Sequence, residues 1–126
     1  MSDYKILLID DDFMSSTYTS LILKKIHPKV EIVCFNNAQD GLCFLKDTHQ
    51  AKPNYIFLDL NMPGMNGWDF MDEFQKMNLN IEVIITTSSN DIKDREKSKL
   101  YSGIYDFFIK PIDFENTKTL FNRVQA

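Results

Sequence analysis

The sequence contains few residues that could form thiol or metal–thiolate sites. Only two of its 126 residues are cysteines, Cys34 and Cys43. Neither belongs to a Cys-x-x-Cys or Cys/His pattern of the kind that binds zinc or carries out redox chemistry. Both lie among apolar residues, so we expect two reduced thiols in the interior. Cysteine usage therefore gives no support for a zinc or redox protein.

Long hydrophobic runs are also missing. No apolar stretch approaches the ~20 residues that a membrane-spanning helix needs, and the N-terminus lacks the pattern of a signal peptide. Linkers, internal repeats and low-complexity segments are absent too. We expect a single cytoplasmic domain over residues 1–126, with no output domain and no membrane insertion.

Positive charge is scarce and dispersed. The chain carries 14 Lys and Arg against 18 Asp and Glu, which gives a net charge of -4. A surface that binds nucleic acid or an anionic membrane needs clustered basic residues. The densest basic segment alternates with acids, as a solvated helix face does: Lys93, Asp94, Arg95, Glu96, Lys97 and Lys99. Direct nucleic-acid binding is therefore not expected.

Four apolar runs are present, and each is followed by a polar side chain. Such runs are typical of parallel strands that are buried on both faces. In an open parallel sheet, ligands bind outside the carboxyl ends of the strands. The polar residues at those ends are Asp10 and Asp11 after residues 6–9, Asp59 after 55–58, Thr87 after 83–85 and Lys110 after 107–109. We expect these side chains to converge on one place.

Strand and helix patterns alternate five times along the chain, which predicts an α/β fold with a five-stranded parallel sheet and helices on both faces. The expected strands are 5–9, 30–35, 55–59, 81–87 and 104–109, and the expected helices are 13–26, 38–46, 68–77, 92–101 and 114–124. The expected inward apolar residues of the helices include Met14, Tyr18, Leu21, Ile22, Leu42, Cys43, Leu45, Phe70, Met71, Phe74, Leu120, Phe121 and Val124. The helix at 92–101 has few apolar residues, so we expect it to be the least firmly packed.

Three carboxylates at neighbouring strand ends, Asp10, Asp11 and Asp59, repel one another unless a cation is present. Oxygen ligands of this kind suit Mg²⁺, which uses one or two carboxylates, water and a phosphoryl group. The backbone carbonyl of Asn61 is a further candidate ligand. The sequence therefore predicts a Mg²⁺ site. A lone Asp10-Asp11-Asp12 segment is more often a helix cap, but one Asp suffices for capping.

A carboxylate beside a metal is also a candidate nucleophile that accepts a phosphoryl group. Transfer to Asp59 requires neutralisation of the phosphoryl oxygens. Lys110 can pair with one oxygen, the Thr87 hydroxyl can donate to another, and Ser88 or Ser89 is a candidate further donor. Each signal alone is typical of a loop or surface turn. Their joint placement at four strand ends favours the functional interpretation.

Taken together, these motifs resemble the receiver domain of two-component response regulators, the CheY-like superfamily. The resemblance spans the chain and rests on four segments: Ile6 to Asp12, Leu58 to Gly67 with its Asp-x-x-Met-Pro-x-Met-x-Gly pattern, Ile85 to Ser88, and Phe108 to Pro111. It implies a flavodoxin-like (βα)5 fold with strand order 2-1-3-4-5. It also implies a phosphoprotein of a phosphorelay.

The resemblance further implies a role for each site residue. Asp59 corresponds to the phosphoacceptor, and Asp11, Asp59 and the Asn61 carbonyl correspond to the Mg²⁺ ligands, with Asp10 completing the acid pair. Thr87 corresponds to the switch hydroxyl, Lys110 to the phosphate-binding lysine and Phe107 to the switch aromatic. Members of the family catalyse their own aspartyl phosphorylation and slow dephosphorylation rather than acting as conventional enzymes.

The partners that the resemblance implies are a histidine kinase or histidine phosphotransfer protein, followed by an unidentified downstream protein. That protein would bind the surface of the fourth helix, fifth strand and fifth helix, and the active form is either a monomer or a phosphorylation-dependent dimer. Three alternatives remain open. The first is a pseudo-receiver that acts as a constitutive binding module. The second is an aspartyl phosphohydrolase, although such enzymes have a second acid where this chain has Asn61. The third is a flavodoxin-like electron carrier, although Asp10 to Asp12 would repel the phosphate of its cofactor.

Overall fold

Five parallel strands form the centre of the molecule in the order β2-β1-β3-β4-β5. The computed structural model describes residues 4–88 and 90–125. The strands are β1 (Lys5–Ile9), β2 (Glu31–Phe35), β3 (Tyr55–Asp59), β4 (Glu82–Thr87) and β5 (Ile104–Ile109). The helices are α1 (Phe13–Ile26), α2 (Ala38–Lys46), α3 (Gly67–Gln75), α4 (Ile92–Ser98) and α5 (Phe114–Gln125). The predicted α/β class, parallel sheet and strand order 2-1-3-4-5 are confirmed.

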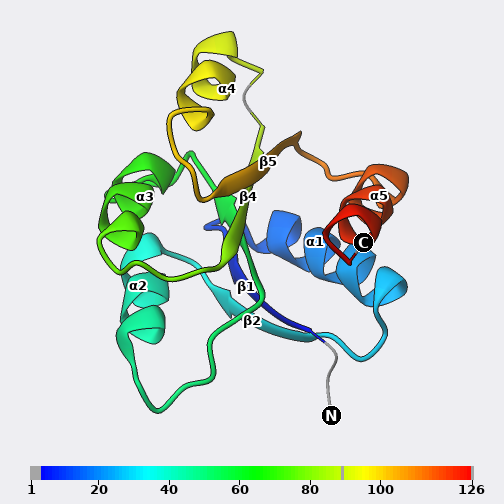
Figure 1. Cartoon of the computed structure of the whole chain (residues 1–126). Coiled ribbons are helices and arrows are strands. Elements are labelled where there is room, and N and C mark those ends of the chain that lie inside the picture. The colour runs from blue at the N-terminus through cyan, green and yellow to red at the C-terminus, as the bar shows by residue number, and fades with distance from the viewer. Residues whose placement is uncertain (1–3, 89, 126) are drawn as a thin grey trace.

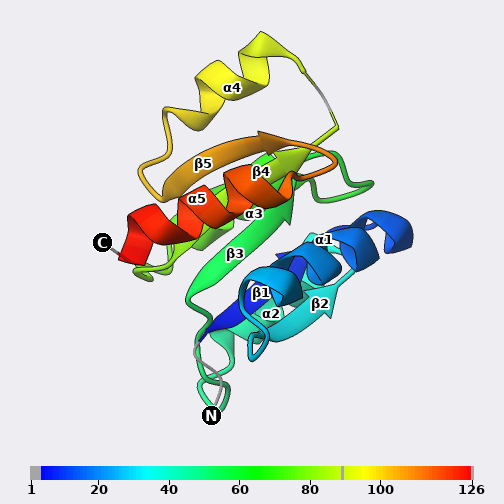
Figure 2. The same ribbon diagram turned by 90° about the vertical axis from the view of Figure 1, so that its right-hand side faces the viewer.

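The helices form two layers around the sheet (Figure 1). Helices α2 and α3 cover one face, and α1 and α5 lie side by side on the other, as the turned view also shows (Figure 2). The two faces hold separate hydrophobic clusters. Along β1, Leu7 and Ile9 belong to the first cluster and Ile6 and Leu8 to the second, because successive side chains of a strand point to opposite faces.

The central strands are the most deeply buried part of the chain. All five residues of β3 are buried, and Phe57 is the largest of those with no exposed surface. The predicted inward residues Phe70, Met71, Leu120 and Phe121 are buried as well. Sheet and helices thus bury their apolar faces against each other, as the continuous apolar runs predicted. The side chain of Val124 lies outside the part of the chain that the structure describes.

The apolar residues of α1 are placed differently from the expectation. Ile22 is buried, but Met14 is 79% exposed, Leu21 56% and Tyr18 44%. Thr19 and Leu23 face the sheet instead. The expected inward stripe was therefore wrong for three of its four apolar positions, because the buried face of α1 is narrow and is centred on Thr19, Ile22 and Leu23.

The expected interior location of the two cysteines is also wrong, since both are exposed. Cys34 lies on β2, which is an edge strand with neighbours on one side only. Cys43 points outward from α2, whereas Leu42 and Leu45 face the sheet. Apolar sequence neighbours do not fix the direction of a side chain on an edge strand or on an amphipathic helix.

Helix α4 is the short element that stands apart at the top of Figure 1. It ends at Ser98 rather than near Tyr101, and Ser98 is the one residue of α4 with a buried side chain. Ile92 is 70% exposed and Leu100, just after the helix, 80%. The weak packing that the sequence predicted for this helix is confirmed. Within the described residues, no helix is long and apolar enough to cross a membrane.

Candidate functional site

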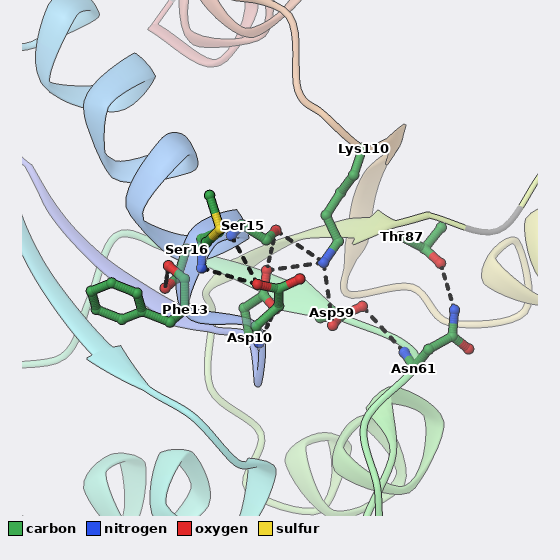
Figure 3. A network of polar contacts seen from close by, with 10 residues as sticks. Asp10, Phe13, Ser15, Ser16, Asp59, Asn61, Thr87 and Lys110 are labelled. Carbon is green, nitrogen blue, oxygen red and sulfur yellow. Dashed lines mark hydrogen bonds and ion pairs between the residues drawn. The ribbon is translucent and has the colours of Figure 1, made fainter.

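The polar residues that follow the central strands converge at one edge of the sheet. Asp10 follows β1, Asp59 ends β3, Thr87 ends β4 and Lys110 follows β5. Because these strands are parallel, their carboxyl ends lie at the same edge. Figure 3 shows Lys110 pointing down toward Asp10 and Asp59, with Thr87 and Asn61 beside them. The predicted convergence is present.

Three carboxylates form the acidic part of this pocket. One oxygen atom from each of Asp10, Asp11 and Asp59 lies within 4.8 Å of the others. Asp10 and Asp59 are each only 3% exposed, whereas Asp11 is open to solvent. The cluster therefore offers oxygen ligands from two buried groups and one accessible group, which is a donor set suited to a hard divalent cation.

The ammonium group of Lys110 bridges two of these acids. Its Nζ lies 3.0 Å from Asp10 Oδ2 and 3.3 Å from Asp59 Oδ2. The Lys110 side chain is 13% exposed. Charge pairs shielded from water in this way are fixed in geometry more firmly than surface ion pairs.

Asp10 and Asp12 have different partners even though they are close in sequence. Asp12 is the N-cap of α1 and accepts hydrogen bonds from the backbone amides of Met14 and Ser15. Asp10 accepts from the Asp12 amide through Oδ1 at 2.9 Å, and from Lys110 and Ser15 through Oδ2. A single aspartate thus caps the helix, which leaves Asp10 and Asp11 for the pocket.

Asn61 connects Asp59 with Thr87. Its backbone amide donates to Asp59 Oδ1 at 3.2 Å, and its side-chain Nδ2 donates to Thr87 Oγ1 at 3.0 Å. Thr87 is fully buried. The sequence suggested only the backbone carbonyl of Asn61 as a functional group. The structure adds the side-chain amide, which holds the hydroxyl of Thr87 in this conformation.

Burial and charged neighbours together set the pKa values of Asp59 and Lys110. Removal from water raises the pKa of Asp59 from 3.8 to about 6, because the opposing effect of the Lys110 charge is smaller and the charge of Asp10 raises it further. Burial by itself lowers the pKa of Lys110, but its hydrogen bond to Asp10 and the charge of Asp59 together raise that pKa. Lys110 is therefore a cation at neutral pH, and a cation that binds at the carboxylates would favour the ionised form of Asp59.

The loop after β3 is closed tightly against Asp59. A Cβ atom at Gly67 would lie 2.8 Å from Leu60 Cα and 2.9 Å from the Asp59 carbonyl oxygen, closer than a side chain permits. Gly64 in the same loop has a φ of +75°, in the region that favours glycine. Asn66 then starts α3 with a capping box to Asp69. The end of the Pro-Gly-Met-Asn-Gly segment therefore packs closely against the backbone of Asp59 and Leu60.

Two further predicted residues, Ser88 and Phe107, lie near this pocket. Ser88 is exposed at the start of the loop after β4, and among the residues that the structure describes no hydrogen bond joins it to Asp10, Asp11 or Asp59. Ser89 lies outside the described residues. Phe107 is 6% exposed and points inward, with the Arg95 guanidinium 4.9 Å from its ring centre. Phe107, the residue predicted as the switch aromatic, therefore lies under α4 rather than in the pocket.

Ser15 is the pocket residue that sequence reasoning missed. Its Oγ donates to Asp10 Oδ2 at 2.7 Å and accepts from Lys110 Nζ at 3.1 Å. The sequence carried one usable signal, since Ser15 lies in the first turn of the helix that Asp12 caps, directly after the acid pair. In the first turn of such a helix, a side chain can point back toward the strand end.

A family model of the response regulator receiver domain matches residues 6–122 of this chain. The chain belongs to this family. Receiver domains are modules of two-component response regulators, and the match favours that class over a phosphohydrolase or an electron carrier. It covers nearly the whole chain, so it includes every residue of the pocket described above.

Solved structures and curated proteins agree with the family assignment. A two-component response regulator from Cytophaga hutchinsonii superposes with a TM-score of 0.85 at 30% identity and covers 96% of both chains. A probable C4-dicarboxylate response regulator from Halalkalibacterium halodurans is 27% identical over 90% of this receiver domain. The sensor histidine kinase CheAY of Helicobacter pylori is 34% identical over 97% of it. The receiver domain spans 48% of the first of these two proteins and 15% of the second.

Proposed function

We propose that this receiver domain accepts a phosphoryl group on Asp59 from a histidine-bearing partner and passes the signal on through a change at α4 and β5. The observation that carries the proposal is the convergence of Lys110, two further carboxylates and a buried hydroxyl on the Asp59 carboxylate. Phosphoryl transfer requires positioning and neutralisation of charge, and these groups supply both.

In the proposed reaction, an Asp59 carboxylate oxygen forms a bond to phosphorus while the bond between phosphorus and the donor imidazole nitrogen breaks. The electron pair of that bond stays on the imidazole, and Asp59 becomes an acyl phosphate. Lys110 Nζ, 3.3 Å from Asp59, is in reach of a phosphoryl oxygen. The Thr87 hydroxyl accepts a hydrogen bond from Asn61 Nδ2, and its own O–H would donate to another phosphoryl oxygen when the side chain turns toward Asp59.

Mg²⁺ fits the acidic cluster as a cofactor, because the three carboxylate oxygens are hard ligands within 4.8 Å of one another. We assign Asp11, Asp59 and the Asn61 carbonyl as its ligands. Asp10 completes the acidic cluster, and its two oxygens accept hydrogen bonds from Asp12, Ser15 and Lys110. When bound, the ion neutralises charge on the carboxylates and on the phosphoryl group.

Helix α1 supplies a surface for the phosphoryl donor next to the pocket. Phe13 is 81% exposed and Met14 79%, and they are the first two residues of α1 after its N-cap Asp12. Large apolar side chains exposed together mark protein contact sites. A histidine kinase or phosphotransfer protein that covers this surface would bring its imidazole over Asp59 and exclude water from the reaction.

The output of the proposed signal lies at α4, β5 and α5. Phe107 connects this surface to the pocket, because it shares β5 with the strand end that leads to Lys110. A downstream protein would recognise the new positions of exposed residues such as Ile92, Leu100 and Tyr105. Because α4 is weakly packed, a free-energy change of only a few kcal/mol is enough to shift the equilibrium between two of its arrangements.

The test is phosphorylation by acetyl phosphate and Mg²⁺, followed by intact-protein mass spectrometry. Wild type should gain the mass of one phosphoryl group, and Asp59→Asn should gain none. The matched control is Asp40→Asn, an exposed aspartate of α2, which should be phosphorylated like wild type. A wild type without mass gain would overturn the proposal and favour a constitutive binding module. An unchanged gain in Asp59→Asn would contradict the choice of acceptor.

A further inference from the structure

Ser15 occupies a position between the acid pair and the lysine of the pocket. Its backbone is fixed by the helix cap, because Ser15 N donates to Asp12 Oδ1 at 3.2 Å. Its hydroxyl points into the pocket, where it donates to Asp10 Oδ2 and accepts from Lys110 Nζ (Figure 3). The contacts among Ser15, Asp10 and Lys110 form a closed triangle with sides of 2.7, 3.0 and 3.1 Å.

The Lys110 ammonium has an acceptor for each of its three N–H donors, and two of these acceptors belong to the triangle. A lysine has three N–H donors, and Lys110 Nζ has three acceptors: Asp10 Oδ2 at 3.0 Å, Ser15 Oγ at 3.1 Å and Asp59 Oδ2 at 3.3 Å. Asp59 is the most distant of them. Two acceptors thus anchor the ammonium on the α1 side, and the third contact, to Asp59, is the one that a phosphoryl oxygen would replace.

We propose that Ser15 is a positioning residue that, together with Asp10, holds the Lys110 ammonium at the place where it meets a phosphoryl oxygen on Asp59. The inference rests on the proposed function of Asp59 as the acceptor. A long lysine side chain loses rotamer freedom when it is fixed. An ammonium that is already anchored before the reaction loses less of that freedom during the reaction.

Ser15 should affect the position of Lys110 without affecting the binding of the metal. Ser15 contacts Asp10 and Lys110, whereas the assigned Mg²⁺ ligands are Asp11, Asp59 and the Asn61 carbonyl. Loss of the Ser15 hydroxyl should therefore lower the maximum rate of phosphorylation and leave the half-saturating Mg²⁺ concentration unchanged. The net contribution of a typical intramolecular hydrogen bond corresponds to roughly a three- to tenfold change in rate.

The experiment measures phosphorylation rates with acetyl phosphate over a series of Mg²⁺ concentrations. Ser15→Ala should lower the rate at saturating Mg²⁺ by roughly three- to tenfold, and Ser15→Thr, which keeps the hydroxyl, should recover most of it. The matched control is Ser16→Ala, because the neighbouring Ser16 hydroxyl donates to the Phe13 carbonyl within α1 and contacts none of the acids. This control should keep the wild-type rate.

A second pair guards against an effect of folding. Ser15→Thr and Ser15→Val have nearly the same shape and differ in the hydroxyl, so a difference in rate between them at equal stability supports the proposal. Equal rates in that pair, or a wild-type rate in Ser15→Ala, would overturn it. So would a rate loss that excess Mg²⁺ restores, because Ser15 would then act on the metal. A wild type that is not phosphorylated at all would instead overturn the proposed function.

Discussion

The pocket and helix α4 are built in opposite ways. In the pocket, Asp10, Asp59 and Thr87 are nearly inaccessible to water, and each has a hydrogen-bond or ion-pair partner from another part of the chain. In α4, by contrast, only Ser98 is buried among the residues of the helix. A conformational change is therefore easier at α4 than in the pocket. Under the proposed function, the firmly held pocket would receive the phosphoryl group and the weakly held helix would be the part that responds.

Several contacts between side chains hold α4 against the rest of the molecule. Arg95 covers the Phe107 ring, and Lys97 lies 5.0 Å from the ring centre of Trp68. Just after the helix, Tyr101 stacks on Trp68 at 5.4 Å and donates through its hydroxyl to Asp72 at 2.8 Å. Each contact of this kind is worth on the order of 1 kcal/mol, so α4 is held by a few weak contacts.

The largest expected difference between the two regions is in stability. Phe57→Ala, in the core beneath the pocket, should lower the free energy of unfolding by about 3–5 kcal/mol, because it leaves a cavity among fully buried residues. Leu100→Ala, beside α4, should change it by less than about 0.5 kcal/mol, since this side chain is 80% exposed. Urea denaturation measures both. A loss above about 1 kcal/mol in Leu100→Ala would mean that this region is not weakly packed.

The second prediction concerns the charge buried in the pocket. The pKa of Asp59 rises from 3.8 to about 6 on folding, so the folded protein binds this proton more tightly than the unfolded chain does. The resulting stability is fully present below pH 3.8 and is lost as the pH rises through about 6. The difference between these pKa values corresponds to about 3 kcal/mol.

Asp59→Asn removes this titration, because an amide stays neutral. In buffer with a chelator, its free energy of unfolding should exceed that of wild type by about 1–3 kcal/mol near pH 8, and the advantage should vanish near pH 4. The Asp40→Asn control should follow the wild-type curve. Added Mg²⁺ should stabilise wild type and leave Asp59→Asn nearly unchanged. Parallel pH curves for wild type and Asp59→Asn would show that the pocket holds an ordinary carboxylate.

Much of this architecture was predictable because parallel strands leave a strong pattern. The continuous apolar runs at residues 6–9 and 55–58 predicted buried central strands, and the strand-end rule predicted that Asp10, Asp59, Thr87 and Lys110 would meet. Both predictions depend on burial on two faces and on topology. These constraints do not depend on the rotamer of any single side chain.

The features that sequence reasoning missed depend on side-chain rotamers and on which strand lies at the side edge of the sheet. The direction of the Ser15 hydroxyl follows from the cap at Asp12 and from the place of Lys110, which is 95 residues away. The exposure of Cys34 follows from the edge position of β2. The exposed apolar face of α1 looked like a core face, because a helix that binds a partner and a helix that packs on a sheet carry the same kind of residues.

The smallest expected effect tests whether side-chain contacts hold α4 in its resting position. Trp68 is the only tryptophan of the chain and lies against Tyr101 and Lys97, so its fluorescence should report a displacement of α4. Arg95→Ala removes the guanidinium above Phe107, a contact worth about 0.5–1 kcal/mol at an exposed site. Displacement of α4 should then become roughly two- to fivefold easier.

The measurement is a titration with beryllofluoride and Mg²⁺ followed by Trp68 fluorescence. Arg95→Ala should reach its midpoint at a concentration roughly two- to fivefold lower than wild type. Lys93→Ala removes an exposed cation from the same helix and should keep the wild-type midpoint, because Arg95 is the α4 cation found over Phe107 in the described part of the chain. Equal shifts in the two variants would mean that the net charge of α4 matters rather than its contact with Phe107. If neither variant shifts the midpoint of the titration, the contacts of Trp68 and Tyr101 would be what holds α4 in its resting position instead.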